Sequence, residues 1–173
     1  SFIPKDINGD SITKYLNGTW NFKLFKNDEL VPKDFFKIDF GKDDWQKIPV
    51  PSNWQFHTDD FPLYTNIVYP YEINPPYMPK EYNPVGLYHR EFTVDKDWND
   101  KQIFIHFGAV NSAFYLWING DFVGYSEGSK TPAEFDISKY LNGSVNQLVM
   151  KVIRWSDGCL LYTSDAADEI TGV

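Results

Sequence analysis

The stretch "AFYLWINGDFVGYSE", residues 113–127, decides the fold class of this chain. Apolar and aromatic residues run through both halves of it, and Asn119-Gly120 stands between them. This dipeptide readily supplies the two residues with positive φ that a type I′ turn requires. The stretch therefore predicts a β-hairpin.

The alternation continues outward from the hairpin. In "VNQLVMKVIRW" (145–155) we expect an inner strand, with Leu148, Met150 and Val152 facing the core and Gln147 and Lys151 facing solvent. Four more segments fit strands: "GTWNFKLFK" (18–26), "WQKIPVP" (45–51), "GLYHREFTV" (86–94) and "QIFIHFG" (102–108). Many short strands with Gly, Pro and Asn-Gly between them are typical of a β-sandwich. The predicted fold class is all-β.

Helix is scarce in this pattern. "DISKYLNG" (136–143) fits one helical turn, capped by Ser138 and ended by Gly143, and little else in the chain qualifies. A length of 173 residues suits one domain with a real core.

Composition excludes several function classes. The net charge of -8 repels phosphate backbones, so we expect no nucleic-acid partner. The single cysteine, Cys159, cannot form an internal disulfide. No apolar run approaches the roughly 20 residues that span a bilayer, and the first residues do not form a signal peptide. We therefore expect no membrane association and a cytoplasmic location.

The chain shows no catalytic set of its own. It has no glycine-rich phosphate loop, and no two of its three histidines have metal-ligand spacing. We expect His89 and His106, on strand faces, to be structural. Acidic pairs such as Asp59-Asp60 read as loop residues, and no sequence rule pairs two carboxylates across a sugar.

One loop is unusual. "YTNIVYPYEINPPYMP" (64–79) contains four prolines, which exclude both a helix and a central strand. Tyrosine rings stack on the apolar faces of sugars, and asparagine amides both donate to and accept from hydroxyls. The alternative is structural: the tyrosines pack on the sandwich, and the asparagines form turns.

An ordered set of motifs resembles a known family. The set comprises "LNGTWNF" (16–22), "VPSNWQ" (50–55), "YTNIVYP" (64–70), "NPPYMP" (74–79), "NPVGLY" (83–88), "VNSAFYLWINGDFVGYSEGSKTPAEFDIS" (110–138) and "RWSDG" (154–158). It resembles the N-terminal sugar-binding domain of the large bacterial β-galactosidases of glycoside hydrolase family 2. The resemblance implies a jelly-roll, galactose-binding-domain-like β-sandwich ahead of an immunoglobulin-like domain and a catalytic barrel. It also implies that both catalytic glutamates lie in that barrel, so we expect the isolated chain to be inactive.

The resemblance assigns roles to three residues. Asn66 matches the asparagine that reaches into the active site and binds galactose. Asp157 matches a ligand of a structural Mg²⁺, and Glu127 occupies the position of another ligand, where a carboxylate suits a hard cation. The implied parent enzyme hydrolyses terminal β-D-galactosides such as lactose with retention, uses Mg²⁺ and Na⁺, and forms homo-oligomers. We expect neither ion to bind the isolated chain firmly.

The chain departs from the family pattern at its end. Residues 1–158 are interpreted as the sugar-binding domain, whereas "CLLYTSDAADEITGV" (159–173) replaces the expected acidic run and is interpreted as foreign sequence. Three alternatives to a β-galactosidase domain stay open. They are a free-standing carbohydrate-binding module, the same domain of a β-glucuronidase or β-mannosidase, and a structural domain that holds an oligomer together.

Overall fold

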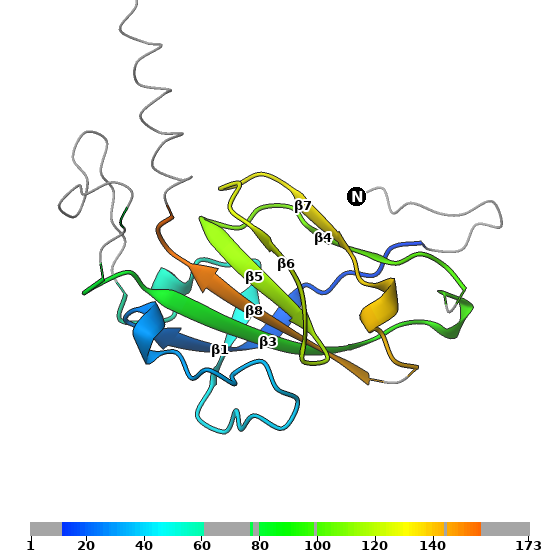
Figure 1. The fold of residues 1–173 in the computed structure, drawn as a ribbon, viewed down its shortest axis with the longest axis horizontal. Helices are drawn as coiled ribbons and strands as arrows, with labels where there is room; N and C mark the ends of the chain where they lie inside the picture. Colours follow the sequence, from blue (N-terminus) through cyan, green and yellow to red (C-terminus); the bar gives the residue numbers. More distant parts are fainter. Residues whose placement is uncertain (1–11, 61–76, 78–79, 99, 144, 157–173) are drawn as a thin grey trace, which may run out of the picture.

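The computed structural model describes residues 12–60, 77, 80–98, 100–143 and 145–156 (Figure 1). Eight strands lie within these residues: β1 (Gly18–Phe25), β2 (Gln46–Val50), β3 (Val85–Thr93), β4 (Phe104–Phe107), β5 (Ala113–Ile118), β6 (Asp121–Ser126), β7 (Ala133–Asp136) and β8 (Val145–Ile153). Four single 3₁₀ turns accompany them: η1 (Asp28–Leu30), η2 (Trp54–Phe56), η3 (Lys96–Trp98) and η4 (Ser138–Tyr140). Within the described ranges, no helix is long and apolar enough to cross a membrane.

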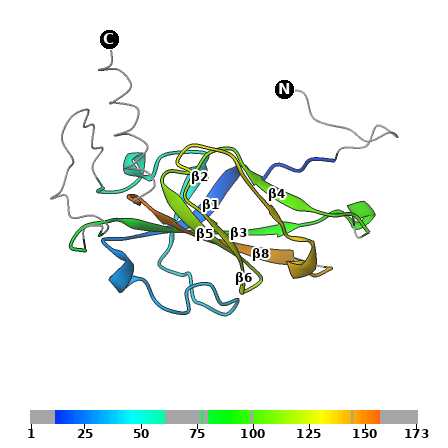
Figure 2. The same cartoon turned by 45° about the horizontal axis from the view of Figure 1, so that its top comes forward.

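The strands form two antiparallel sheets. The larger has the order β2-β1-β3-β8-β5-β6, and the smaller pairs β4 with β7. The small sheet lies over one face of the large one, toward its β5–β6 end (Figures 1 and 2). This arrangement confirms the predicted all-β sandwich.

The main core lies between the two sheets. One row of paired residues crosses five strands of the large sheet: Phe22, Tyr88, Met150, Leu116 and Gly124. The row ends on a glycine because the Phe135 ring of β7 covers that position, and a Cβ on Gly124 would lie 2.4 Å from the ring. Gly124 therefore sets how closely the small sheet approaches β6.

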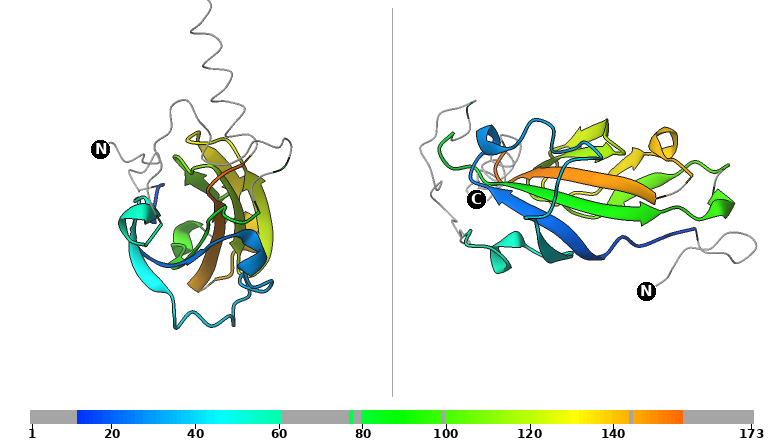
Figure 3. Two further views of the ribbon diagram at one scale, coloured as in Figure 1. Left: turned by 90° about the vertical axis from the view of Figure 1, so that its left-hand side faces the viewer. Right: turned by 90° about the horizontal axis from the view of Figure 1, so that it is seen from below.

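The opposite face of the large sheet is also covered. The connection from β1 to β2 runs along it (Figure 3) and places Phe35 and Trp45 against Leu87 and Val149. The expectation that Gln147 faces solvent is therefore wrong. This side chain is 7% exposed, and its amide donates to the backbone carbonyl of Phe36 over 3.2 Å.

The predicted hairpin is confirmed, with φ of 52° at Asn119 and 88° at Gly120. The Asn119 amide also donates to the Tyr140 carbonyl over 2.9 Å, which ties the hairpin tip to η4. The helical turn at 138–140 is confirmed as well, but Ser138 does not cap it. The Ser138 hydroxyl instead donates to Asp136 over 2.6 Å and accepts from the Ile103 backbone over 2.8 Å.

His89 is a buried histidine on the outer face of β3, 5% exposed. The Asn21 amide nitrogen, Nδ2, can only donate, so it places an acceptor at His89 Nδ1, 3.1 Å away, and the proton of the neutral ring on Nε2. Among the residues that the structure describes, that Nε2 has no hydrogen-bond partner. Burial, helped by the positive charge of Lys42, lowers the pKa of His89 to about 4, whereas the Gln147 side chain opposes this shift. His89 is thus structural, as expected.

Gly124→Ala should destabilise the domain by about 1–3 kcal/mol, because the new methyl group meets the Phe135 ring. Gly41→Ala is the control, since no atom lies within 4 Å of a Cβ there, and its cost should stay within about 0.5 kcal/mol. Urea unfolding of both variants measures the two costs. Equal costs would contradict the packing described for β6 and β7.

Acid should destabilise the domain through His89. The pKa is lower in the folded state than the ordinary 6.5, so between pH 6.5 and about 4 the unfolded chain binds the proton and the folded chain does not. The free energy of unfolding should therefore fall as the pH falls, by roughly 2 kcal/mol at pH 5 from this residue alone. Urea unfolding of the unsubstituted chain and of His89→Gln, repeated from pH 8 to 4.5, gives the free energy of unfolding of each and isolates the contribution of His89. Parallel pH profiles would refute it.

Candidate functional site

Two of the three residues with predicted roles, Asn66 and Asp157, lie outside the described residues. The third, Glu127, is exposed just after β6 and accepts a hydrogen bond from the Tyr125 hydroxyl over 2.7 Å. Within the described part of the chain, no three His, Cys, Asp or Glu side chains gather as a metal would require. Glu127 alone does not make a Mg²⁺ site, and the predicted ion stays a prediction.

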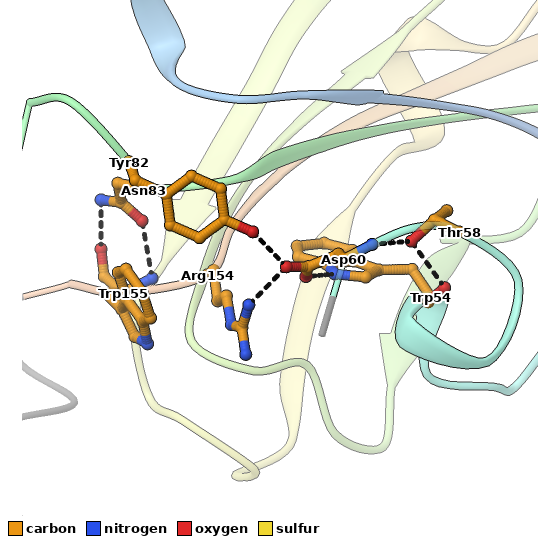
Figure 4. A network of polar contacts seen from close by, with 7 residues as sticks. All are labelled: Trp54, Thr58, Asp60, Tyr82, Asn83, Arg154 and Trp155. Carbon is orange, nitrogen blue, oxygen red and sulfur yellow. Dashed lines mark hydrogen bonds and ion pairs between the residues drawn. The ribbon is translucent and has the colours of Figure 1, made fainter. Parts of the chain in front are cut away.

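The described residues contain a buried polar network centred on Asp60 (Figure 4). The Asp60 side chain is fully buried. Its Oδ1 accepts from Arg154 Nη1 over 2.7 Å and from the Tyr82 hydroxyl over 2.5 Å, and its Oδ2 accepts from the Trp54 indole over 2.6 Å. Three hydrogen bonds, one of which is also the ion pair with Arg154, thus stabilise this buried carboxylate.

The partners of Asp60 are themselves held in place. The Arg154 backbone N–H donates to the Pro84 carbonyl over 3.0 Å, and its guanidinium lies 5.0 Å from the centre of the Trp155 ring. Asn83 and Trp155 exchange two hydrogen bonds of 3.0 and 3.1 Å. Figure 4 shows that the network joins the turn around Trp54 to the start of β3 and the end of β8.

Burial within this network changes the acidity of the Tyr82 phenol. Burial and the neighbouring Asp60 carboxylate raise the pKa of Tyr82 to about 12, although Arg154 opposes the shift. The phenol therefore remains a hydrogen-bond donor throughout the physiological pH range. Asp60 Oδ1 is therefore bonded from the Tyr82 side as well as from the Arg154 side.

The residues of the network are close in sequence to two of the residues with predicted roles. Asp60 immediately precedes residues 61–76, which carry Asn66, and Tyr82 lies just after them. Arg154 stands three residues before Asp157. A buried ion pair contributes little net stability compared with apolar side chains of similar volume, so we interpret this one as fixing where the three chain segments meet.

A shallow hollow of about 320 Å³ adjoins the network. It lies between η1, the segment before β3 and the end of β8, and Tyr125 of β6 completes its lining. Ser156, on its wall, is 7% exposed, and its hydroxyl has no hydrogen-bond partner within the described part of the chain.

Sequence reasoning missed the network because it took Asp59-Asp60 for loop residues. Asp60 does lie in a connection, but its partner Arg154 is 94 positions away. Two features of the sequence could have indicated it: Arg154 at the end of the strand pattern of residues 145–155, and Trp54 six residues before Asp60. Neither feature reveals the pairing without the fold.

Asp60→Asn and Arg154→Met should each destabilise the domain by about 3–5 kcal/mol, because each leaves one buried charge without its partner. The double variant Asp60→Asn/Arg154→Met should lose less than the sum of the two single losses, since no buried charge remains. The exposed pair Lys14–Asp95 is the control and should contribute under about 1 kcal/mol. Urea unfolding gives the free energies for both double-mutant cycles. Additive losses at Asp60 and Arg154 would show that the pair is not coupled.

Comparison of the chain with known proteins identifies its family. The model of the glycosyl hydrolases family 2 sugar binding domain matches residues 13–172. The β-galactosidase of Priestia megaterium is 48% identical over 154 residues, which cover 87% of this chain. The β-galactosidase of Pectobacterium atrosepticum is 50% identical over 151 residues. The chain spans about 15% of the length of these curated relatives.

Solved structures agree on the fold. A β-glucuronidase from Lactobacillus rhamnosus matches with a TM-score of 0.61 and 25% identity, over 80% of this chain and 20% of that one. A β-glucuronidase from Ruminococcus gnavus, in complex with an N1-substituted uronic isofagomine, matches with a TM-score of 0.60 and 26% identity, over 80% of this chain and 21% of that one. The chain belongs to the sugar-binding domain family of the family 2 glycosyl hydrolases.

Proposed function

We propose that this chain serves as the N-terminal sugar-binding domain of a β-galactosidase that hydrolyses terminal β-D-galactosides such as lactose with retention. The observation that carries the proposal is the 48% identity with the Priestia megaterium β-galactosidase over 154 residues. The β-glucuronidase structures share the fold at 25–26% identity. The large difference in identity favours galactosides over glucuronides as substrates.

In this proposal the domain contributes a substrate contact and no catalytic group. Retaining hydrolysis needs two carboxyl groups about 5 Å apart, one as nucleophile and one as acid and base. We assign both to the part of the relatives' length that this chain does not span. Asn66 supplies an amide that both donates to and accepts from a galactose hydroxyl. The network of Asp60, Tyr82 and Arg154 fixes the two ends of the segment that carries Asn66.

The proposed partners follow from the same assignment. The remaining domains of the parent polypeptide complete the pocket around the substrate, and the parent assembles as a homo-oligomer. Mg²⁺ and Na⁺ are proposed for the parent enzyme, where Asp157 and Glu127 would be candidate ligands for Mg²⁺. A carboxylate at each of these positions suits a hard cation.

A chimera tests the proposal. Residues 13–156 replace the matching segment of the Priestia megaterium β-galactosidase, and hydrolysis of a nitrophenyl β-D-galactoside is measured. We expect an active enzyme, and we expect Asn66→Ala to lower kcat/KM about tenfold or more through the lost hydrogen bond. Asn17→Ala is the matched control, because Asn17 is exposed and its contact to Arg90 uses only the backbone carbonyl.

Two results would contradict the proposal. One is a folded chimera without activity toward the galactoside. The other is an Asn66→Ala chimera with the same kcat/KM as the Asn17→Ala chimera. Circular dichroism and unfolding curves of all chimeras separate a lost contact from a lost fold.

A further inference from the structure

The hollow beside the polar network has the composition of a ligand site. Asp28, Glu29 and Lys80 lie in its lining together with Tyr125 and Trp155. Neither the Glu29 carboxylate nor the Lys80 ammonium has a hydrogen-bond or ion-pair partner among the described residues. The lining thus combines two exposed charges at the rim with two aromatic side chains over a mostly apolar surface.

A buried hydroxyl strengthens this interpretation. The Ser156 hydroxyl lies on the same wall, shielded from solvent, and makes no hydrogen bond to any residue that the structure describes. An unsatisfied buried polar group costs free energy unless something else bonds to it. The hydroxyl therefore points independently to a polar occupant of the hollow.

The walls of the hollow are already ordered. Lys151 Nζ pairs with Asp28 over 3.0 Å and lies 4.7 Å from the centre of the Tyr115 ring. The Tyr115 ring is 4.6 Å from that of Tyr125. On the other side, the two hydrogen bonds from Asn83 fix the backbone of Trp155. Groups held in this way lose little conformational entropy when a ligand binds.

The chemistry of the lining selects one ligand class. A pyranose has an apolar C–H face for an aromatic ring, and its hydroxyls donate to a carboxylate and accept from an ammonium. The volume of about 320 Å³ lies at the small end of the range for ligand pockets and suits a single ring. The net charge of -8 disfavours phosphorylated ligands, and the free charges of Glu29 and Lys80 disfavour an apolar one.

We propose that this hollow is a pyranose-binding site on the domain itself, with Glu29, Lys80 and Ser156 bonding the hydroxyls and Tyr125 and Trp155 contacting the ring. It is separate from the contact proposed for Asn66, and it does not depend on hydrolysis by the parent enzyme. The occupant is the terminal sugar of a glycoside or a free monosaccharide. Either one would bind with the modest affinity of a shallow, open site.

The test is an NMR titration of the 173-residue chain with methyl β-D-galactopyranoside and with lactose. The Trp155 indole N–H and the amides of Lys80 and Ser156 should shift saturably at millimolar sugar, whereas the indoles of the core residues Trp20 and Trp54 should not. Galactitol, an open-chain polyol without the ring, is the ligand control and should give no saturable shift.

Matched variants locate the binding groups. Glu29→Gln should raise Kd about tenfold through the lost charged acceptor, and Ser156→Ala should raise it about threefold. Glu81→Gln removes a neighbouring charge that does not line the hollow, and it should leave Kd unchanged. Unfolding curves establish that each variant is folded.

Three outcomes would overturn the proposal. They are shifts that stay linear up to about 100 mM sugar, galactitol shifts equal to those of the pyranoside, and a Kd that Glu29→Gln changes no more than Glu81→Gln does. Loss of binding in Asn66→Ala with binding retained in Glu29→Gln would also overturn it, and it would place the sugar on the 61–76 segment instead. The chimera's activity is measured separately, so failure of this proposal leaves the proposed function standing.

Discussion

The carboxylate of Asp60 is the constraint around which one end of the sandwich is organised. A charge that is fully buried must be neutralised where it lies, and here Arg154, Tyr82 and Trp54 all contribute to it. These residues come from the end of β8, the start of β3 and the turn after β2. Trp54 also packs against Phe22 in the main core, with ring centres 6.0 Å apart. The polar network and the apolar core therefore share a side chain, and neither can shift without the other.

Under the proposed function, this arrangement fixes the chain on both sides of the segment that carries the substrate contact. A substrate contact is effective only when its position is fixed to a fraction of an ångström. The ion pair holds Asp60 and Arg154 against the end of the large sheet, so the chain at both residues keeps a fixed position. Arginine suits the task because its guanidinium presents several donors in a fixed plane, whereas lysine would present a flexible point charge.

Local sequence predicted those features that depend on neighbouring residues. The Asn119-Gly120 turn and the alternation in β3, β4 and β5 depend only on residues a few positions apart in the sequence. The structure confirms both. Features that depend on contacts between distant segments could not be predicted from the sequence. Gln147 is polar and reads as exposed until the β1–β2 connection covers it, and Asp60 reads as a loop residue until β8 delivers Arg154. The role of Asn66 came from resemblance alone, because an amide on a loop has no local signature of the ligand it contacts.

The order of strands in the large sheet has a consequence for how the chain acquires its structure. The central pairing joins β3 to β8, from Val85 with Ile153 at one end to Thr93 with Val145 at the other. The two strands that hold the sheet together are thus separated by more than fifty residues of sequence, so loop-closure entropy must be overcome before their hydrogen bonds form. On a ribosome, β1, β2 and β3 would emerge as an incomplete sheet with an open edge along β3 until β8 has been synthesised. β8, the last strand in the described part of the chain, therefore closes that edge, and the exposed edge of β3 is open to pairing with other chains until β8 arrives.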